Sequence, residues 1–147
     1  MTQKVLLTLR GMQFDQSGEN ADRISTAANG DYYKKNNKHY VIYEEFTEGF
    51  DQPTKNRLKF SGDMVELSRS GSVNVHMVFQ VNKKNLTNYN TPFGQILMGI
   101  NTKKIQIQEQ ENHITLEVEY SLYVSDEFLS DCHMQIDICS QNNSSPF

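Results

Sequence analysis

Residues 114–124 decide the fold, and their sequence is ITLEVEYSLYV. Every second position holds a large apolar side chain, and most positions between them are polar. Successive side chains on a β-strand point to opposite faces, so this period of two predicts a half-buried strand. The side chains expected to face inward are Ile114, Leu116, Val118, Tyr120, Leu122 and Val124.

The same period of two recurs along the rest of the chain. It predicts strands at residues 5–10, 24–35, 38–46, 56–60, 64–70, 73–81, 95–100 and 103–108, the second of them interrupted near Gly30. A last strand should turn Cys132, Met134, Ile136 and Ile138 inward. The nearest candidate for a helix, residues 126–132, suffices for one or two turns at most. The chain is therefore predicted to be all-β.

Turn signals separate these strands, and the clearest is the pair Asn36-Asn37, which tolerates the left-handed conformations of a tight hairpin. A succession of hairpins favours an antiparallel meander, and a long meander removes its exposed edges by closing into a barrel. We expect a single closed, mainly antiparallel meander β-barrel of about 8–10 strands. This domain should span residues 1–140, and residues 141–147 should form a polar C-terminal tail.

Residues 87–94, TNYNTPFG, form the most turn-rich stretch between the two strand-like halves. Pro92 fixes its own φ, and Gly94 permits a positive φ. We interpret the stretch as a corner that sets the register between the two halves of the barrel. It should bring Tyr89 and Phe93 over one mouth, whereas residues 82–85 should form an ordinary hairpin tip.

The composition argues against several classes of partner. The 147 residues include 18 acidic and 14 basic side chains, giving a net charge of −4, whereas nucleic-acid binding needs a clustered basic excess. No signal peptide and no membrane span of about 20 apolar residues is expected. Cys132 and Cys139 lie at an odd spacing on one predicted strand, so they should face opposite ways and form no disulfide. We therefore expect a cytoplasmic protein.

Four runs of sequence carry a family resemblance. They are GDYYKKNNKHYVIYEE at residues 30–45, LSRSG at 67–71 leading into MVF at 77–79, YNTPFG at 89–94 and LEVEYSL at 116–122. Together they resemble the YwiB-like bacterial family of unknown function over nearly the whole chain. The resemblance implies a calycin, that is, a lipocalin-like closed barrel. It implies no activity, because none is established for the family.

No catalytic or metal-binding motif stands out. The histidines His39, His76, His113 and His133 are scattered without metal-ligand spacing, and His76 is expected to face outward. The sequence also contains no nucleophile elbow, phosphate-binding loop or dinucleotide fingerprint. We therefore predict no cofactor and no enzymatic activity.

Residues 32–40 form a basic, aromatic hairpin that could stack bases and follow phosphates. The preferred interpretation is an ordinary hairpin tip with tyrosines paired across the strands. Lysine pairs also occur at other predicted turns, at residues 83–84 and 103–104, which supports this interpretation.

Arg69 has the period-two phase of Val65 and Leu67, so it should point inward. A buried guanidinium needs a partner, and two arrangements are considered. It could hold a ligand carboxylate bidentately, or it could sit at the end of its strand and either reach solvent or pair with Glu45. The position at the strand end, with solvent or Glu45 as the partner, is preferred.

The function that we hypothesise is binding of a small, largely apolar or carboxylate-bearing ligand in the barrel or at its mouth. The candidate ligand-binding residues are Arg69, Tyr43, Tyr89, Phe93 and Met77. The deformable lining would come from Met64, Met77, Met98 and Met134. The alternative is a barrel filled with side chains that serves as a protein-interaction or homodimerisation module.

Overall fold

The computed structural model describes residues 3–14, 20–46, 53–71, 74–91 and 94–141. These residues form ten β-strands. Their bounds are β1 Gln3–Phe14, β2 Asn20–Lys35, β3 Lys38–Glu45, β4 Thr54–Ser61, β5 Met64–Ser70, β6 Val75–Gln80, β7 Lys84–Thr91, β8 Gly94–Glu109, β9 His113–Val124 and β10 Glu127–Ser140. Within the described ranges, no helix has the length and apolarity that crossing a bilayer requires.

The strands form one antiparallel sheet in the order β6-β5-β4-β3-β2-β1-β10-β9-β8-β7. Apart from β1 and β10, neighbouring strands also follow one another in the chain, so the predicted meander is confirmed. The pairing of β1 with β10 joins the two ends of the chain. The predicted closure needs one correction, because β6 and β7 remain the two edges of the sheet. The result is a nearly closed barrel.

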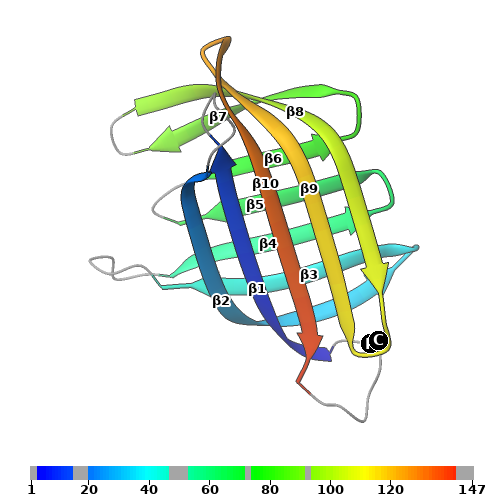
Figure 1. The fold of residues 1–147 in the computed structure, drawn as a ribbon. Coiled ribbons are helices and arrows are strands. Elements are labelled where there is room, and N and C mark those ends of the chain that lie inside the picture. Colours follow the sequence, from blue (N-terminus) through cyan, green and yellow to red (C-terminus); the bar gives the residue numbers. More distant parts are fainter. Residues whose placement is uncertain (1–2, 15–19, 47–52, 72–73, 92–93, 142–147) are drawn as a thin grey trace.

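The sheet folds into two layers whose strands cross (Figure 1). β1, β9 and β10 lie in one layer, and β3 to β7 lie in the other. The two longest strands, β2 and β8, run through both layers. β2 pairs with β1 as far as Tyr32 but with β3 only from Gly30, and β8 has a register shift between Thr102 and Lys104. Bends and bulges of this kind allow one strand to pass from one layer to the next.

These two bends explain two differences from the sequence prediction. The expected interruption near Gly30 is a change of partner within a continuous strand. The strands expected at residues 95–100 and 103–108 are the two arms of β8, joined through the bulge at its bend. A bulge disturbs the alternation locally without ending the strand, so its sequence pattern looks like a turn.

The alternating apolar residues fill the space between the layers, as predicted. Ile114, Leu116 and Val118 are fully buried, and all four inward residues predicted for the last strand are buried. Ser121 is an exception on β9: it was expected outside, yet it is buried and its hydroxyl donates to Asp131 at 2.6 Å. The short helix considered at residues 126–132 does not form, since β10 already begins at Glu127.

The interpretation of the turns is partly wrong. Asn36 and Asn37 have φ values of 54° and 64°, which confirms their tight hairpin. However, residues 87–91 continue β7, and Thr91 pairs with Gly94 of β8, so the stretch 87–94 is a hairpin rather than the corner. The chain instead passes from one edge of the sheet to the other around Asn82, where an ordinary hairpin tip was expected.

Candidate ligand-binding site

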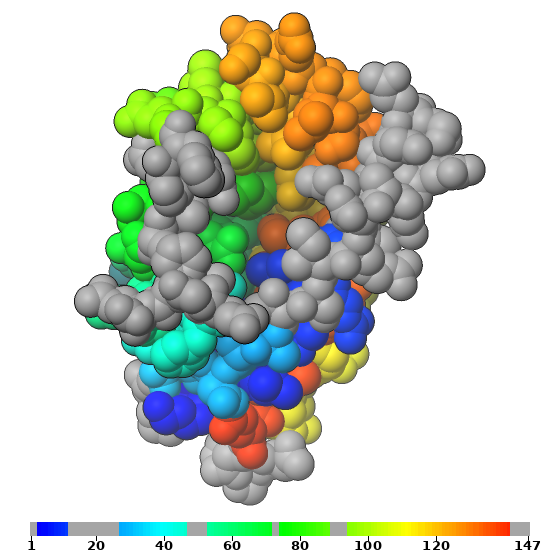
Figure 2. Space-filling model, turned by 90° about the vertical axis from the view of Figure 1, so that its left-hand side faces the viewer, coloured from blue at the N-terminus to red at the C-terminus, as the bar shows by residue number. Residues whose placement is uncertain are grey.

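One end of the barrel is hollow. β3 ends, β4 begins, β5 ends and β6 begins on the left of Figure 1. Figure 2 views the molecule from that side and shows a hollow between the green segments and the blue and orange ones. The hollow therefore lies between the β6 edge of one layer and the strands of the other layer.

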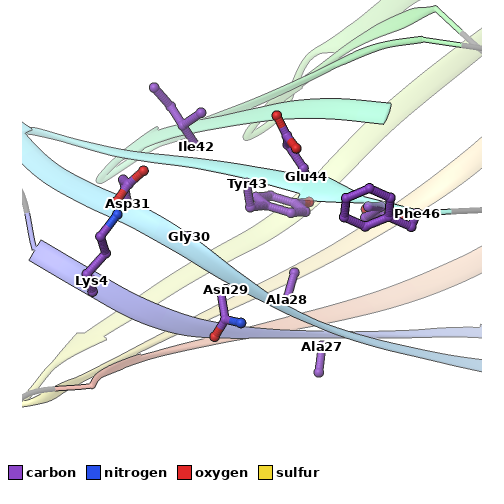
Figure 3. A pocket seen from close by; sticks show the side chains of 11 residues that line it. Lys4, Ala27, Ala28, Asn29, Gly30, Asp31, Ile42, Tyr43, Glu44 and Phe46 are labelled. Atoms are coloured by element: carbon purple, nitrogen blue, oxygen red, sulfur yellow. Dashed lines mark hydrogen bonds and ion pairs between the residues drawn. The ribbon is translucent and has the colours of Figure 1, made fainter. Parts of the chain in front are cut away.

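A cleft of about 750 Å³ opens where β2 and β3 separate (Figure 3). The ladder between them ends at the pair Gly30 and Tyr43. A Cβ on Gly30 would lie 3.0 Å from the carbonyl oxygen of Ile42 and 3.2 Å from the Cβ of Tyr43, so only glycine fits without movement. The remaining lining residues are Lys4, Ala27, Ala28, Asn29, Asp31, Glu44, Glu45 and Phe46.

A polar row crosses the inner face of the sheet beside this cleft. Tyr43 on β3 stands opposite Asn56 on β4, which stands opposite Arg69 on β5. The Arg69 Nε donates to the Asn56 Oδ1 at 2.9 Å, and its second guanidinium nitrogen donates to the Glu45 Oε1 at 2.8 Å. The Asn56 amide nitrogen donates in turn to the backbone oxygen of Thr54 at 3.3 Å. These bonds hold the guanidinium in one orientation at the end of the barrel.

The Tyr43 hydroxyl differs from the rest of this row. Tyr43 is 2 % exposed, and its hydroxyl oxygen has no hydrogen-bond partner among the residues that the structure describes. Burial raises the pKa of Tyr43 to about 12, Glu45 adds to this shift, and Arg69 opposes it. The hydroxyl is therefore a neutral group that is able both to donate and to accept a hydrogen bond.

The charges around the cleft are largely balanced in pairs. Lys4 and Asp31 form an ion pair of 2.7 Å at its outer side, and Arg69 and Glu45 form one of 2.8 Å on its inner side. Ile42 and Tyr43 extend to opposite sides of β3 in Figure 3. The lining of the cleft thus combines apolar side chains with paired charges and with the uncharged Tyr43.

The structure brings two of the five predicted site residues together. Arg69 and Tyr43 belong to the same row, and of the two partners preferred for Arg69, solvent or Glu45, the structure shows the ion pair with Glu45. Met77 lies on β6 opposite Leu67, half-buried against the core, and it does not line the cleft. Tyr89 pairs with Ile96 in the β7–β8 hairpin, while Phe93 lies outside the described residues.

The expected methionine lining needs one correction. Met134 is buried, and Met77 and Met98 pack against the core. Met64 alternates with the fully buried Val65, so it faces the outside of the barrel. Asn56 was missed, although its alternation with Leu58 gives it the inward phase on β4 and could have revealed it.

Comparison with known proteins supports the fold. The crystal structure of the ywiB protein from Bacillus subtilis superposes with a TM-score of 0.82 at 24% sequence identity, covering 96% of this chain and 94% of that one. In sequence, the chain is 30% identical over 128 residues to the uncharacterized beta-barrel protein YwiB of Bacillus subtilis, across 86% of this chain and 88% of the relative. The expected calycin-like assignment is compatible with the architecture of both.

The family model for a domain of unknown function, DUF1934, matches residues 7–136. This match extends from β1 into β10 and so includes the polar row and every residue that lines the cleft except Lys4. The chain therefore belongs to the DUF1934 family of domains of unknown function.

Proposed function

We propose that the protein binds a small, largely apolar molecule at the hollow end of the barrel, with one polar atom of the ligand hydrogen-bonded to Tyr43. The observation that carries this proposal is the buried Tyr43 hydroxyl, which has no described partner and lies beside a cleft of about 750 Å³. A buried polar group without a partner costs about 1–3 kcal/mol, so a ligand that supplies a partner recovers that free energy.

The pairing of Arg69 narrows the chemistry of the ligand. Asn56 and Glu45 already engage the Nε and one terminal nitrogen of the Arg69 guanidinium, and the ion pair with Glu45 offsets the positive charge that would attract a ligand carboxylate. The site therefore favours an uncharged ligand, such as one with a hydroxyl, carbonyl or amide group on an apolar body. Arg69 and Asn56 then act by fixing the shape of the row, and Tyr43 makes the polar contact.

The proposed setting is the cytoplasm. Cys132 and Cys139 are free thiols on β10, and free thiols suit a reducing compartment. The ligand would then be a small molecule of the cell interior.

Tyr43→Phe tests the proposal, with Tyr33→Phe as the matched control. Tyr33 loses the same hydroxyl from the outer side of the β2–β3 hairpin, where its ring stacks on Tyr40. Native mass spectrometry of gently purified protein should show a bound small molecule in the wild type and in Tyr33→Phe. We expect the occupancy of the bound molecule to fall at least about tenfold in Tyr43→Phe, because a factor of this size corresponds to the loss of one good hydrogen bond.

The stability of the ligand-free protein gives an independent measure. Without ligand, the free energy of unfolding of Tyr43→Phe in urea should equal that of the wild type or exceed it by as much as about 3 kcal/mol. The reason is that the substitution removes a buried group that lacks a partner. The proposal fails if Tyr43→Phe is clearly destabilised and the wild type carries no bound molecule. That result would mean that the hydroxyl has a partner within the protein.

A further inference from the structure

The outer face of β4 carries a row of cations. Lys55, Arg57 and Lys59 alternate with the buried residues Asn56 and Leu58, so all three point away from the core. Ion pairs among the described residues engage Lys4, Lys34, Arg69 and Lys103, but neither Arg57 nor Lys59. Three cations thus lie on one face of a chain whose net charge is −4, with Glu44 and Glu66 as the carboxylates on the neighbouring strands.

Two of these cations border a depression of about 220 Å³ on the outer face of β4, β5 and β6. The other lining residues are Glu66, Ser68 and His76. Arg57 stands opposite Ser68, and Ser68 stands opposite His76, so three hydrogen-bonding side chains form a row across adjacent strands. Glu66 stands opposite Lys59 and approaches the His76 Nε2 at 4.0 Å.

The Tyr40 ring orders the two cations. The Arg57 guanidinium carbon lies 5.4 Å from the centre of this ring, and the Lys59 Nζ lies 5.8 Å from it. Both distances fall within the range of cation–π attraction, which holds the charges near the ring without neutralising them. A cation held in this way loses less conformational entropy when it binds an anion.

We propose that this depression, which we call the outer groove, binds a small oxyanion of the phosphate type, either free or as a phosphate monoester. The guanidinium fork of Arg57 matches two oxygens of such a group, and Lys59 supplies a second positive charge. The Ser68 hydroxyl and the His76 imidazole add donors on the opposite side of the outer groove. This site lies on the outside of the barrel and does not depend on the ligand proposed for Tyr43.

The stacking of Tyr40 favours a small anion over single-stranded nucleic acid as the ligand of the outer groove. Its ring is stacked on Tyr33 at 4.8 Å with an interplanar angle of 6°, and the two cations approach from the β4 side. β3 lies between β2 and β4, so both faces of the ring are occupied. Binding of single strands relies on exposed aromatic faces for stacking bases, and Tyr40 offers none.

Nuclear magnetic resonance titration of the full chain with inorganic phosphate tests this proposal, with chloride at matched ionic strength as the reference. We expect saturable shifts of backbone amides in β4, β5 and β6, with a Kd on the order of 1 mM. Arg57→Gln should weaken binding at least about tenfold. Lys55→Gln is the matched control: it removes one charge from the same face of the same strand but does not line the outer groove, so the Kd should change less than about twofold.

Further titrations distinguish free phosphate, a phosphate monoester and nucleic acid as ligands of the outer groove. Adenosine monophosphate should bind about as tightly as inorganic phosphate, and Ser68→Ala should weaken both by a similar factor. The proposal is overturned if no saturable shift appears by roughly 20 mM phosphate, or if Lys55→Gln weakens binding as much as Arg57→Gln. It is also overturned if a single-stranded oligonucleotide binds far more tightly than phosphate in an Arg57-dependent way. Unchanged thermal melting of Arg57→Gln and Ser68→Ala would show that both remain folded.

Discussion

His39 is buried with both ring nitrogens engaged. Its Nδ1 lies 2.8 Å from the Tyr32 hydroxyl, its Nε2 lies 2.8 Å from a carboxylate oxygen of Glu109, and its ring stacks on Phe60 at 4.6 Å. These contacts connect the β2–β3 hairpin to the end of β8. Desolvation is the largest influence on the His39 pKa and lowers it; Glu109 opposes this effect, and Lys34 adds to it.

This lowered pKa predicts that stability falls as the solution becomes acidic. The unfolded chain takes up a proton on His39 near pH 6.5, its ordinary value, whereas the folded protein does so only at lower pH. The contribution of neutral His39 is therefore complete above about pH 6.5 and is lost as the pH falls towards the folded-state pKa.

Urea unfolding between about pH 8 and pH 5 measures this dependence. His39→Gln should show a shallower loss of unfolding free energy below about pH 6.5 than the wild type. Its overall stability will differ for reasons of packing, so the slope is the readout. His133→Gln is the control, since it removes a histidine that is only half-buried, on β10. An unchanged slope in His39→Gln would contradict the prediction.

At the residue scale, the alternation along a strand predicted which face each side chain takes. It did not predict which hydrogen-bond partner that side chain finds. Period two placed Arg69 inside and His76 outside, and both placements are confirmed. The same rule would have placed Asn56 beside Arg69. It could not have shown that the Tyr43 hydroxyl is left without a described partner, because that depends on the geometry of β4 and β5 together.

At the element scale, the strands were predictable, but their bends and turns were less so. The alternation that identified β9 and β10 follows from one buried face, which is a local property of each strand. The bend of β8 depends on which strands it joins, and that information is not local. For the same reason, the hairpin at residues 87–94 and the crossing near Asn82 exchanged roles: both contain turn-forming residues, and only the pairing of distant strands distinguishes them.

Gly94 gives a test of the β7–β8 hairpin. Its φ is 127°, a conformation that side chains with a Cβ rarely adopt, although no heavy atom lies within 4 Å of where a Cβ would be. Gly94→Ala should therefore destabilise the fold by about 1–2 kcal/mol through backbone strain alone.

Chemical denaturation compared with Gly62→Ala isolates this strain. Gly62 also lies in a turn and also has open space around the Cβ position, but its φ is not in the positive range. Its replacement should be neutral or stabilising by up to about 1 kcal/mol, through a less flexible unfolded chain. Equal effects of the two substitutions would show that the φ of Gly94 is not the cause.

At the scale of the whole molecule, the barrel is held together by a continuous strand ladder between β1 and β10, whereas β6 and β7 meet as two sheet edges. β1 and β10 are paired from Val5 with Ser140 to Phe14 with Asp131, so the two ends of the chain close the barrel firmly. β6 and β7 face each other as the sheet edges, and the Thr87 hydroxyl donates to the backbone oxygen of His76 at 2.6 Å across this seam. Such an edge is expected to open at a lower free energy than the central ladders.

Hydrogen exchange should therefore be faster for amides of β6 and β7 than for those shared by β1 and β10. Thr87→Val keeps the shape of the side chain but removes the hydroxyl, so it should weaken the seam by about 0.5–1.5 kcal/mol. Exchange from β6 and β7 should then accelerate by roughly 2–12-fold, with the β1–β10 ladder unchanged.

Thr115→Val provides the control for this experiment. The Thr115 hydroxyl donates to Asp137 at 3.1 Å on the outer side of β9 and β10, a pair of strands that β8 separates from β7 and that is not part of the seam. This substitution should leave exchange in β6 and β7 as it is in the wild type. If Thr87→Val instead accelerated exchange in all ten strands alike, the barrel would open only by global unfolding, and the seam would have no independent motion.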